Sequence, residues 1–174
     1  GSQGALAINE VIPAVLAGLP EEMRPSVRHQ TGEGTFDSTR AAYADKGLGS
    51  VDDITLVAFI SDMAEAYSWA DLVICRSGAS TVSEVAAVGL PSILVPYPHH
   101  SDQQQTHNAN WLVQAGAALL LEQKDLTTSA LKTLVLDLHE NRHKLQQMSD
   151  ISRSIAIRDA DEIIARRCLE LAHA

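Results

Sequence analysis

The sequence predicts an α/β fold in which helices cover both faces of a doubly wound parallel sheet, within a single domain spanning residues 1–174. Short apolar runs rich in β-branched residues alternate with stretches of helical periodicity, the order that right-handed βαβ crossovers produce. Ala, Val, Leu and Ile dominate a hydrophobic content of 45%, whereas aromatic residues make up only 4%. That balance suits a parallel sheet between helices better than an all-β sandwich.

Two of the expected strands define the type of sheet. The runs "DLVIC" at 71–75 and "SILVP" at 92–96 are apolar on both faces, as buried parallel strands are. In chain order, strands are expected at 26–30, 54–59, 71–75, 92–96 and 117–121.

Helical patterns fill the segments around these strands and the whole final third of the chain. Helices are expected at 5–16, 35–46, 62–69, 81–88, 103–114, 128–138, 142–149 and 160–172. Pro13 lies inside the first of these and predicts a kink or an early end, because proline removes a helical hydrogen bond.

The composition excludes several classes of function. The formal net charge is −9, and no Lys/Arg cluster is longer than Arg166–Arg167, so nucleic acid is not an expected partner. Cys75 and Cys168 are far apart and neither belongs to a CxxC motif, which favours reduced thiols in a cytosolic protein. No apolar run reaches the roughly 18 residues that span a bilayer.

Ligands of doubly wound sheets bind beyond the carboxyl ends of the strands. Function is therefore expected in the loops at 1–4, 32–34, 59–62, 76–81 and 97–108. The opening "GSQGA" is a glycine-containing turn before an apolar helix, which is typical of a phosphate-binding loop at a helix N-terminus. Such loops normally follow a strand, and none precedes Gly1. A Gly-Ser start is also typical of a cloning remnant, although its continuation into a helix favours a native loop.

The segment "RSGASTVSE" joins an expected strand to a helix. Gly78 allows a ligand to approach the backbone where the first N–H groups of the helix are free. Glu84 follows about one turn later, and its carboxylate could accept two hydrogen bonds from a ribose diol. The alternative is purely structural, because Thr81-Val-Ser-Glu84 matches a capping box.

The segment "PYPHHSDQQQTHNA" combines a predicted N-cap with a cluster of primary amides. Asp102 is expected to cap the helix, and the amides that follow suit sugar hydroxyls because they both donate and accept: Gln103, Gln104, Gln105 and Asn108. A solvated helix start is the alternative. The nearby histidines do not have the spacing of a zinc site, and Ser77 does not lie on a nucleophile elbow, so no metal and no catalytic triad are expected.

These segments together resemble the C-terminal, donor-binding domain of the MurG family, N-acetylglucosaminyltransferases that convert lipid I to lipid II in peptidoglycan synthesis. The resemblance covers nearly the whole chain and rests on these segments, in order: "GSQGA", "HQTGEG", "FISDMAEAYSWADLVICRSGASTVSE", "GLPSILVPYP" and "DQQQTHNA". It implies one Rossmann-like half of a GT-B enzyme, whose active site lies between two such domains. UDP-N-acetylglucosamine is the implied donor, and no cofactor is expected.

The resemblance also implies roles for individual residues. Glu84 matches the carboxylate that holds the ribose hydroxyls, and the backbone of Ile60 matches the group that reads uracil. The glycine loop with Ser2 and Gly4 matches a diphosphate contact. The remaining implied donor-binding residues border the sugar-nucleotide pocket: Arg76, Gly78, Ala79, Gln104, Gln105 and Asn108. No catalytic residue is expected in this chain.

Some features of the family pattern are absent here. A second glycine, the strand before it and the entire N-terminal acceptor domain are missing, Gln103 replaces a basic residue of some relatives, and Thr106–His107 replaces an aromatic pair. We therefore expect a fragment that lacks the first strand of its sheet, and a sheet interrupted near its middle. Lipid I and the cytoplasmic face of the bacterial inner membrane would be contacted through the missing domain, and the fragment alone would be soluble and inactive.

Two other functions stay open on the sequence alone. One is a different GT-B enzyme, such as a UDP-N-acetylglucosamine epimerase or a glycolipid glycosyltransferase. The other is a nucleotide-sugar binding module without chemistry.

Overall fold

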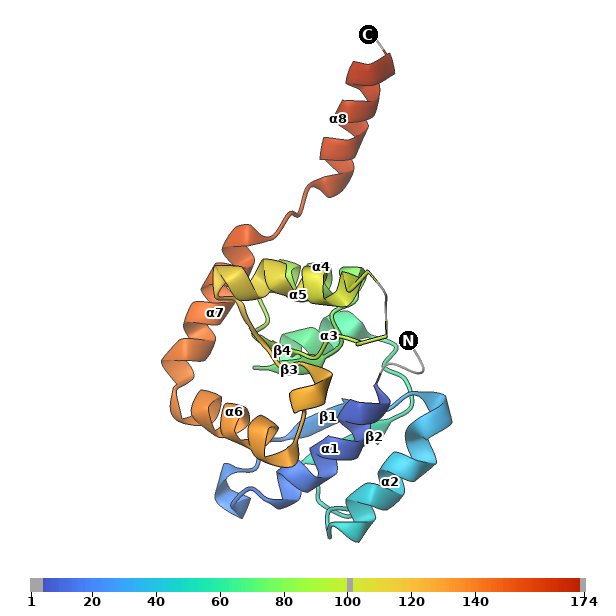
Figure 1. Cartoon of the computed structure of the whole chain (residues 1–174), viewed down its shortest axis with the longest axis vertical. Coiled ribbons are helices and arrows are strands. Elements are labelled where there is room, and N and C mark those ends of the chain that lie inside the picture. The colour runs from blue at the N-terminus through green and yellow to red at the C-terminus, as the bar shows by residue number, and fades with distance from the viewer. Residues whose placement is uncertain (1–4, 100–101, 173–174) are drawn as a thin grey trace.

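The computed structural model describes residues 5–99 and 102–172, and Figure 1 shows the path of the chain. Its strands are β1 (Val27–Gln30), β2 (Ile54–Val57), β3 (Val73–Cys75), β4 (Ser92–Leu94) and β5 (Ala118–Leu120). All five expected strands are confirmed, and every pairing between them is parallel. Each observed strand is one or two residues shorter than the apolar run that predicted it. Some flanking residues still bond to the neighbouring strand: the Val95 N–H, just after β4, donates to the carbonyl of Cys75 in β3 at 2.9 Å.

The eight expected helices are also present. They are α1 (Leu6–Ala17), α2 (Phe36–Asp45), α3 (Met63–Trp69), α4 (Ala79–Val88), α5 (Gln104–Ala115), α6 (Thr128–Glu140), α7 (Arg142–Ile155) and α8 (Ala160–Ala172). The expected early end at Pro13 is wrong, because α1 continues to Ala17 with Pro13 buried inside it. Short 3₁₀ turns occur at Glu21–Met23, Glu33–Thr35 and Gln123–Asp125.

The strands form two separate groups. β1 pairs with β2, and β4 pairs with β3 on one side and β5 on the other. Within the described residues no strand joins the two groups, so β1 and β3 each have one neighbour only. The expected interruption in the middle of the sheet is confirmed.

One apolar cluster nevertheless joins the two groups. It combines residues of β1 and β2, such as Val27 and Leu56, with Ile93 of β4 and with buried residues of α1 and α6. Leu94 points the other way, into a second cluster with α4 and α5. Ile93 and Leu94 are consecutive residues of β4 and pack into different clusters, so helices cover both faces of the sheet. Figure 1 shows α4 and α5 on one side of the strands and α1 and α6 on the other.

Helix α8 is an exception to this packing. It extends away from the layered domain (Figure 1), and none of its described residues is buried. Among the described residues no helix is long and apolar enough to cross a membrane.

Candidate donor-binding site

The loops after β2, β3 and β4 leave the sheet at one edge, because parallel strands bring their carboxyl ends together. Two hydrogen bonds tie the loop after β3 to α5. The buried Ser77 hydroxyl donates to the Gln105 carbonyl at 2.7 Å, and Asn108 Nδ2 donates to the Ser77 carbonyl at 3.1 Å. Residues that are 28 and 31 positions apart thus fix the turn that leads into α4.

The turn into α4 leaves its N-terminus open. Gly78 is the N-cap and has no side chain to occupy the free N–H groups of the first turn. A methyl group at Gly78 would meet nothing nearer than the Thr81 hydroxyl at 3.9 Å, so the space in front of this glycine is not filled by the protein. This end of the helix has the character of an anion or polar-ligand site.

The capping-box interpretation of Glu84 is wrong. The helix begins at Ala79 rather than at Thr81, so Thr81 lies inside the first turn and is not the N-cap. Glu84 Oε2 instead accepts a hydrogen bond from the Tyr67 hydroxyl of α3 at 3.0 Å. The Glu84 carboxylate is exposed and is held from a neighbouring helix rather than used at its own helix start.

Arg76 braces the site rather than standing open at its border. Its guanidinium donates to the carbonyls of Val95 and Pro96, both at 3.0 Å, and to Gln123 Oε1 at 2.6 Å. It also lies 5.6 Å from the ring centroid of Tyr97. These contacts hold the loop after β4 against the end of β3.

The amides of the α5 segment divide into two kinds. Gln105 Oε1 accepts from the Tyr97 N–H at 3.0 Å, and Asn108 uses its Nδ2 on Ser77, so each has one polar atom engaged in the scaffold. Gln104 is exposed, and its side chain makes no hydrogen bond within residues 5–99 and 102–172. Gln104 and the equally exposed Gln103 thus leave their amides open to a ligand.

The start of α5 differs from the expectation that Asp102 is the N-cap. The N-cap is Gln103, with φ at 50°, the one positive value among the described non-glycine residues. Asp102 Oδ1 accepts from the Gln104 N–H at 3.4 Å, a long bond. A left-handed glutamine is locally strained, and such strain is common in ligand-binding loops.

The loop after β2 carries Ile60, whose backbone was expected to read a base. The Ile60 N–H donates to Gln30 Oε1 at 2.9 Å, so a side chain of β1 occupies this group. Phe59 beside it is 72% exposed. The sequence does not predict this contact of Gln30. Gln30 lies in the "HQTG" segment at the end of β1, whereas Ile60 follows β2, and nothing in the sequence links the two positions.

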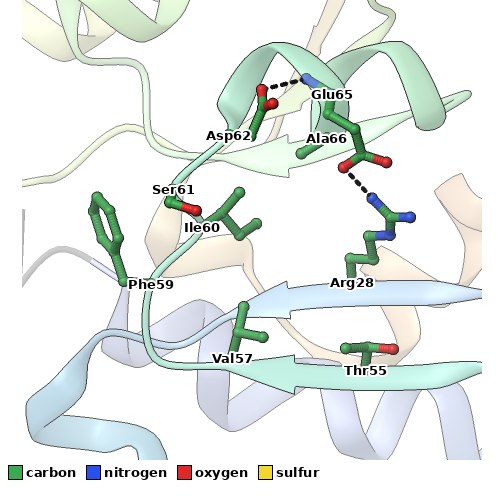
Figure 2. Close-up of a pocket in the computed structure, with 9 residues that line it drawn as sticks. All are labelled: Arg28, Thr55, Val57, Phe59, Ile60, Ser61, Asp62, Glu65 and Ala66. Atoms are coloured by element: carbon green, nitrogen blue, oxygen red, sulfur yellow. Dashed lines mark hydrogen bonds and ion pairs between the residues drawn. The ribbon is translucent and has the colours of Figure 1, made fainter.

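A cavity of about 400 Å³ lies behind this loop, between β1, β2 and α3 (Figure 2). It is crossed by an ion pair between Arg28 and Glu65 at 2.6 Å, while Asp62 caps α3 by accepting from the Glu65 N–H at 2.9 Å. The ring of Phe59 points away from the other lining side chains (Figure 2). The cavity therefore adjoins the candidate site without containing Glu84 or the α4 N-terminus.

Ser2 and Gly4 lie outside the described residues, as does His100. In the part of the chain that the structure describes, no group of three His, Cys, Asp or Glu side chains could hold a metal ion. Burial raises the pKa of the Cys75 thiol to about 12, so this neighbour of the site is not a nucleophile at neutral pH.

Comparison with known proteins gives consistent results. Residues 1–164 match the model of the glycosyltransferase family 28 C-terminal domain. Relatives from Marinobacter nauticus and Burkholderia mallei are 46% and 47% identical over 99% and 100% of this chain. Both are named UDP-N-acetylglucosamine--N-acetylmuramyl-(pentapeptide) pyrophosphoryl-undecaprenol N-acetylglucosamine transferase. The chain covers 47% of each, so it spans about half the length of these relatives.

Solved structures give the same result for the fold. MurG of Acinetobacter baumannii superposes with a TM-score of 0.87 at 38% identity, covering 98% of this chain and 50% of that one. A glycosyltransferase of kitacinnamycin superposes at 0.61 with 19% identity, covering 92% and 39%, which supports the fold alone.

Proposed function

Since the chain belongs to the glycosyltransferase family 28 C-terminal domain family, we propose that it is the donor-binding half of an N-acetylglucosaminyltransferase that uses UDP-N-acetylglucosamine. The names of its relatives support this donor and a lipid-linked N-acetylmuramyl-pentapeptide acceptor. The observation that carries the proposal is Glu84, an exposed carboxylate of α4 that takes no part in helix capping, on a helix whose N-terminus at Gly78 is open.

Each part of the donor has a counterpart at the edge of the sheet. Glu84 accepts hydrogen bonds from the ribose diol, and the backbone of Ile60 pairs with the uracil edge. The α4 N-terminus at Gly78 and Ala79 and the glycine loop with Ser2 and Gly4 bind the diphosphate. Gln104 contacts the sugar directly. Gln105 and Asn108 contact the donor through the amide atoms that are not bonded to Tyr97 or Ser77. Arg76 keeps the loop after β4 in place.

The proposed reaction is an inverting transfer. The C4 hydroxyl of N-acetylmuramic acid attacks the anomeric carbon, the new bond forms as the bond to the diphosphate oxygen breaks, and UDP leaves with the electron pair. Helix N-termini stabilise the charge that accumulates on the diphosphate. The acceptor proton goes to a base outside this chain. The acceptor and the membrane are contacted through an N-terminal domain, corresponding to the half of the relatives that this chain does not cover.

Calorimetric titration of the 174-residue chain with UDP-N-acetylglucosamine tests donor binding. We expect saturable binding that Glu84→Gln weakens by about tenfold, because that change removes a charge-assisted acceptor. Glu162→Gln on α8 is the matched control and should bind as the parent chain does. Equal affinities for the parent and Glu84→Gln would contradict the assignment, and absence of binding by the parent would contradict the function.

A further inference from the structure

Tyr67 and Glu84 form a pair that joins two helices at the candidate site. Tyr67 lies in α3, Glu84 lies in α4, and the phenol donates to Glu84 Oε2 at 3.0 Å. The Tyr67 ring packs against the apolar cluster under α4 and α5, whereas the carboxylate is exposed. A ring fixed by packing thus holds a side chain that would otherwise sample several rotamers.

We propose that Tyr67 is a positioning residue for recognition of the ribose diol. By donating to Oε2 it fixes the plane of the Glu84 carboxylate, so that Oε1 and the remaining lone pair of Oε2 face the ligand. A carboxylate has about four acceptor sites, so one bond from Tyr67 leaves enough for two ribose hydroxyls. The inference rests on the proposed function, since Tyr67 is assigned to orient the carboxylate that binds the donor.

The chemistry of the pair fits this role. Burial, followed by the hydrogen bond and negative charge of Glu84, raises the pKa of the Tyr67 hydroxyl. The phenol therefore remains a donor at every physiological pH. A phenol, unlike Arg or Lys, orients the carboxylate without neutralising its charge, so the Glu84 oxygens keep their strength as acceptors.

The position of Tyr67 in the fold adds a second consequence. Helix α3 begins directly after the loop of Phe59 and Ile60. The Tyr67–Glu84 bond therefore links the helix behind the proposed base-reading loop to the helix that carries the proposed ribose acceptor. Loss of this bond should affect recognition of the ribose hydroxyls more than recognition of the base.

The test compares the 174-residue chain with its Tyr67→Phe variant in titrations with UDP, 2′-deoxy-UDP and CDP. We expect the parent to prefer UDP over 2′-deoxy-UDP. Tyr67→Phe should lose about five- to tenfold in affinity for UDP and less for 2′-deoxy-UDP, which keeps only one of the two hydroxyls, so that this preference shrinks while the ratio of UDP to CDP is retained. The matched control is Tyr43→Phe, which removes another phenol hydroxyl, bonded to His29 and belonging to the other apolar cluster.

Several outcomes would overturn the inference. An unchanged ratio of UDP to 2′-deoxy-UDP in Tyr67→Phe contradicts it while leaving the proposed function intact, and so does an equal loss for both nucleotides, which indicates a structural role. A parent chain that binds no UDP contradicts the function itself. If Tyr67→Phe does not fold, ¹⁹F NMR of the parent labelled with 3-fluorotyrosine replaces it, since the chain has three tyrosines. The Tyr67 resonance should shift more with UDP than with 2′-deoxy-UDP, and equal shifts would contradict the proposal.

Discussion

Asn9 Oδ1 and His29 Nε2 lie 2.9 Å apart in the buried region between α1 and β1. Asn9 Nδ2 donates to the Thr31 carbonyl at 2.9 Å and to Thr35 Oγ1 at 3.0 Å, so Asn9 Oδ1 must be the acceptor. His29 therefore carries its proton on Nε2, and Nδ1 accepts from the Tyr43 hydroxyl at 3.0 Å. This network of neutral groups ties α1, which follows the glycine loop, to the turn at Gly32.

The network predicts a loss of stability in mild acid. Burial lowers the pKa of His29 from 6.5 to about 4. Between these values the unfolded chain binds a proton that the folded protein excludes, so the free energy of unfolding decreases as the pH falls through this window, by about 3 kcal/mol in total. Above about pH 6.5 the contribution of His29 is constant.

Urea unfolding at pH 7.5 and at pH 4.5 measures this effect. The loss in the parent should exceed the loss in His29→Gln, because that variant has no buried imidazole to protonate. His143→Gln, which changes an exposed histidine of α7, should retain the behaviour of the parent. Identical losses in the parent and in His29→Gln would show that the acid sensitivity has another source.

A second prediction concerns Gly78. Its φ of −61° and ψ of 150° are accessible to any residue, and a Cβ there meets no atom nearer than 3.9 Å. Gly78→Ala should therefore change the free energy of unfolding by no more than about 1 kcal/mol, because the reduced entropy of the unfolded chain is offset by alanine being a poorer N-cap than glycine. The same methyl group enters the space proposed for the donor, so UDP affinity should fall by about tenfold or more.

Gly32→Ala is the opposite case and serves as the control for stability. Gly32 has φ at +82°, so a Cβ there is strained, and the variant should unfold at a lower temperature. Thermal unfolding and UDP titration of both variants provide the comparison. If Gly78→Ala binds UDP as tightly as the parent, the diphosphate does not lie against this turn.

A third prediction concerns the bond from Asn108 to the Ser77 carbonyl at 3.1 Å. Asn108→Asp replaces a donor by a carboxylate that faces a carbonyl oxygen, while the shape of the side chain is kept. We expect a loss of about 1–3 kcal/mol in the free energy of unfolding and weaker UDP binding, because the turn before α4 is displaced. Asn110→Asp, on the same helix and with no such contact among the described residues, should be nearly neutral in chemical unfolding. A stable Asn108→Asp variant would mean that the turn does not depend on the bond from Asn108.

The sequence was most informative where a pattern is local. The runs at 71–75 and 92–96 predicted buried strands, because apolar residues on both faces admit few other structures. Helix starts were less predictable. Glycine at 78 caps α4 by its backbone alone, and strained Gln103 displaces Asp102 from the N-cap position.

Contacts between distant residues could not be predicted from spacing. The sequence pattern around Tyr67 indicates only a core residue of α3. Its bond to Glu84, 17 residues away, depends on the packing of α3 beside α4. The sequence indicates ligand contacts for Arg76 and Asn108, and the structure adds bonds from both side chains to backbone carbonyls, which spacing does not reveal. Polar residues suited to sugars are equally suited to carbonyls, so residue type alone does not show which contacts belong to the fold.

The last prediction concerns Gln30, whose Oε1 occupies the Ile60 N–H at 2.9 Å. If this N–H reads the O4 atom of uracil, bound uridine must displace the Gln30 amide. Gln30→Ala removes the competitor, and water then takes its place in the free protein. Because one neutral hydrogen bond contributes about 0.5–1.5 kcal/mol net, UDP affinity should rise about two- to twelvefold. CDP presents an amine where uracil presents O4, so its affinity should not rise. Competition titrations of the parent and Gln30→Ala with both nucleotides measure the two changes. An equal gain for UDP and CDP would indicate that Gln30 obstructs the loop sterically, and a loss for UDP would indicate that Gln30 instead holds the Ile60 backbone in its binding conformation.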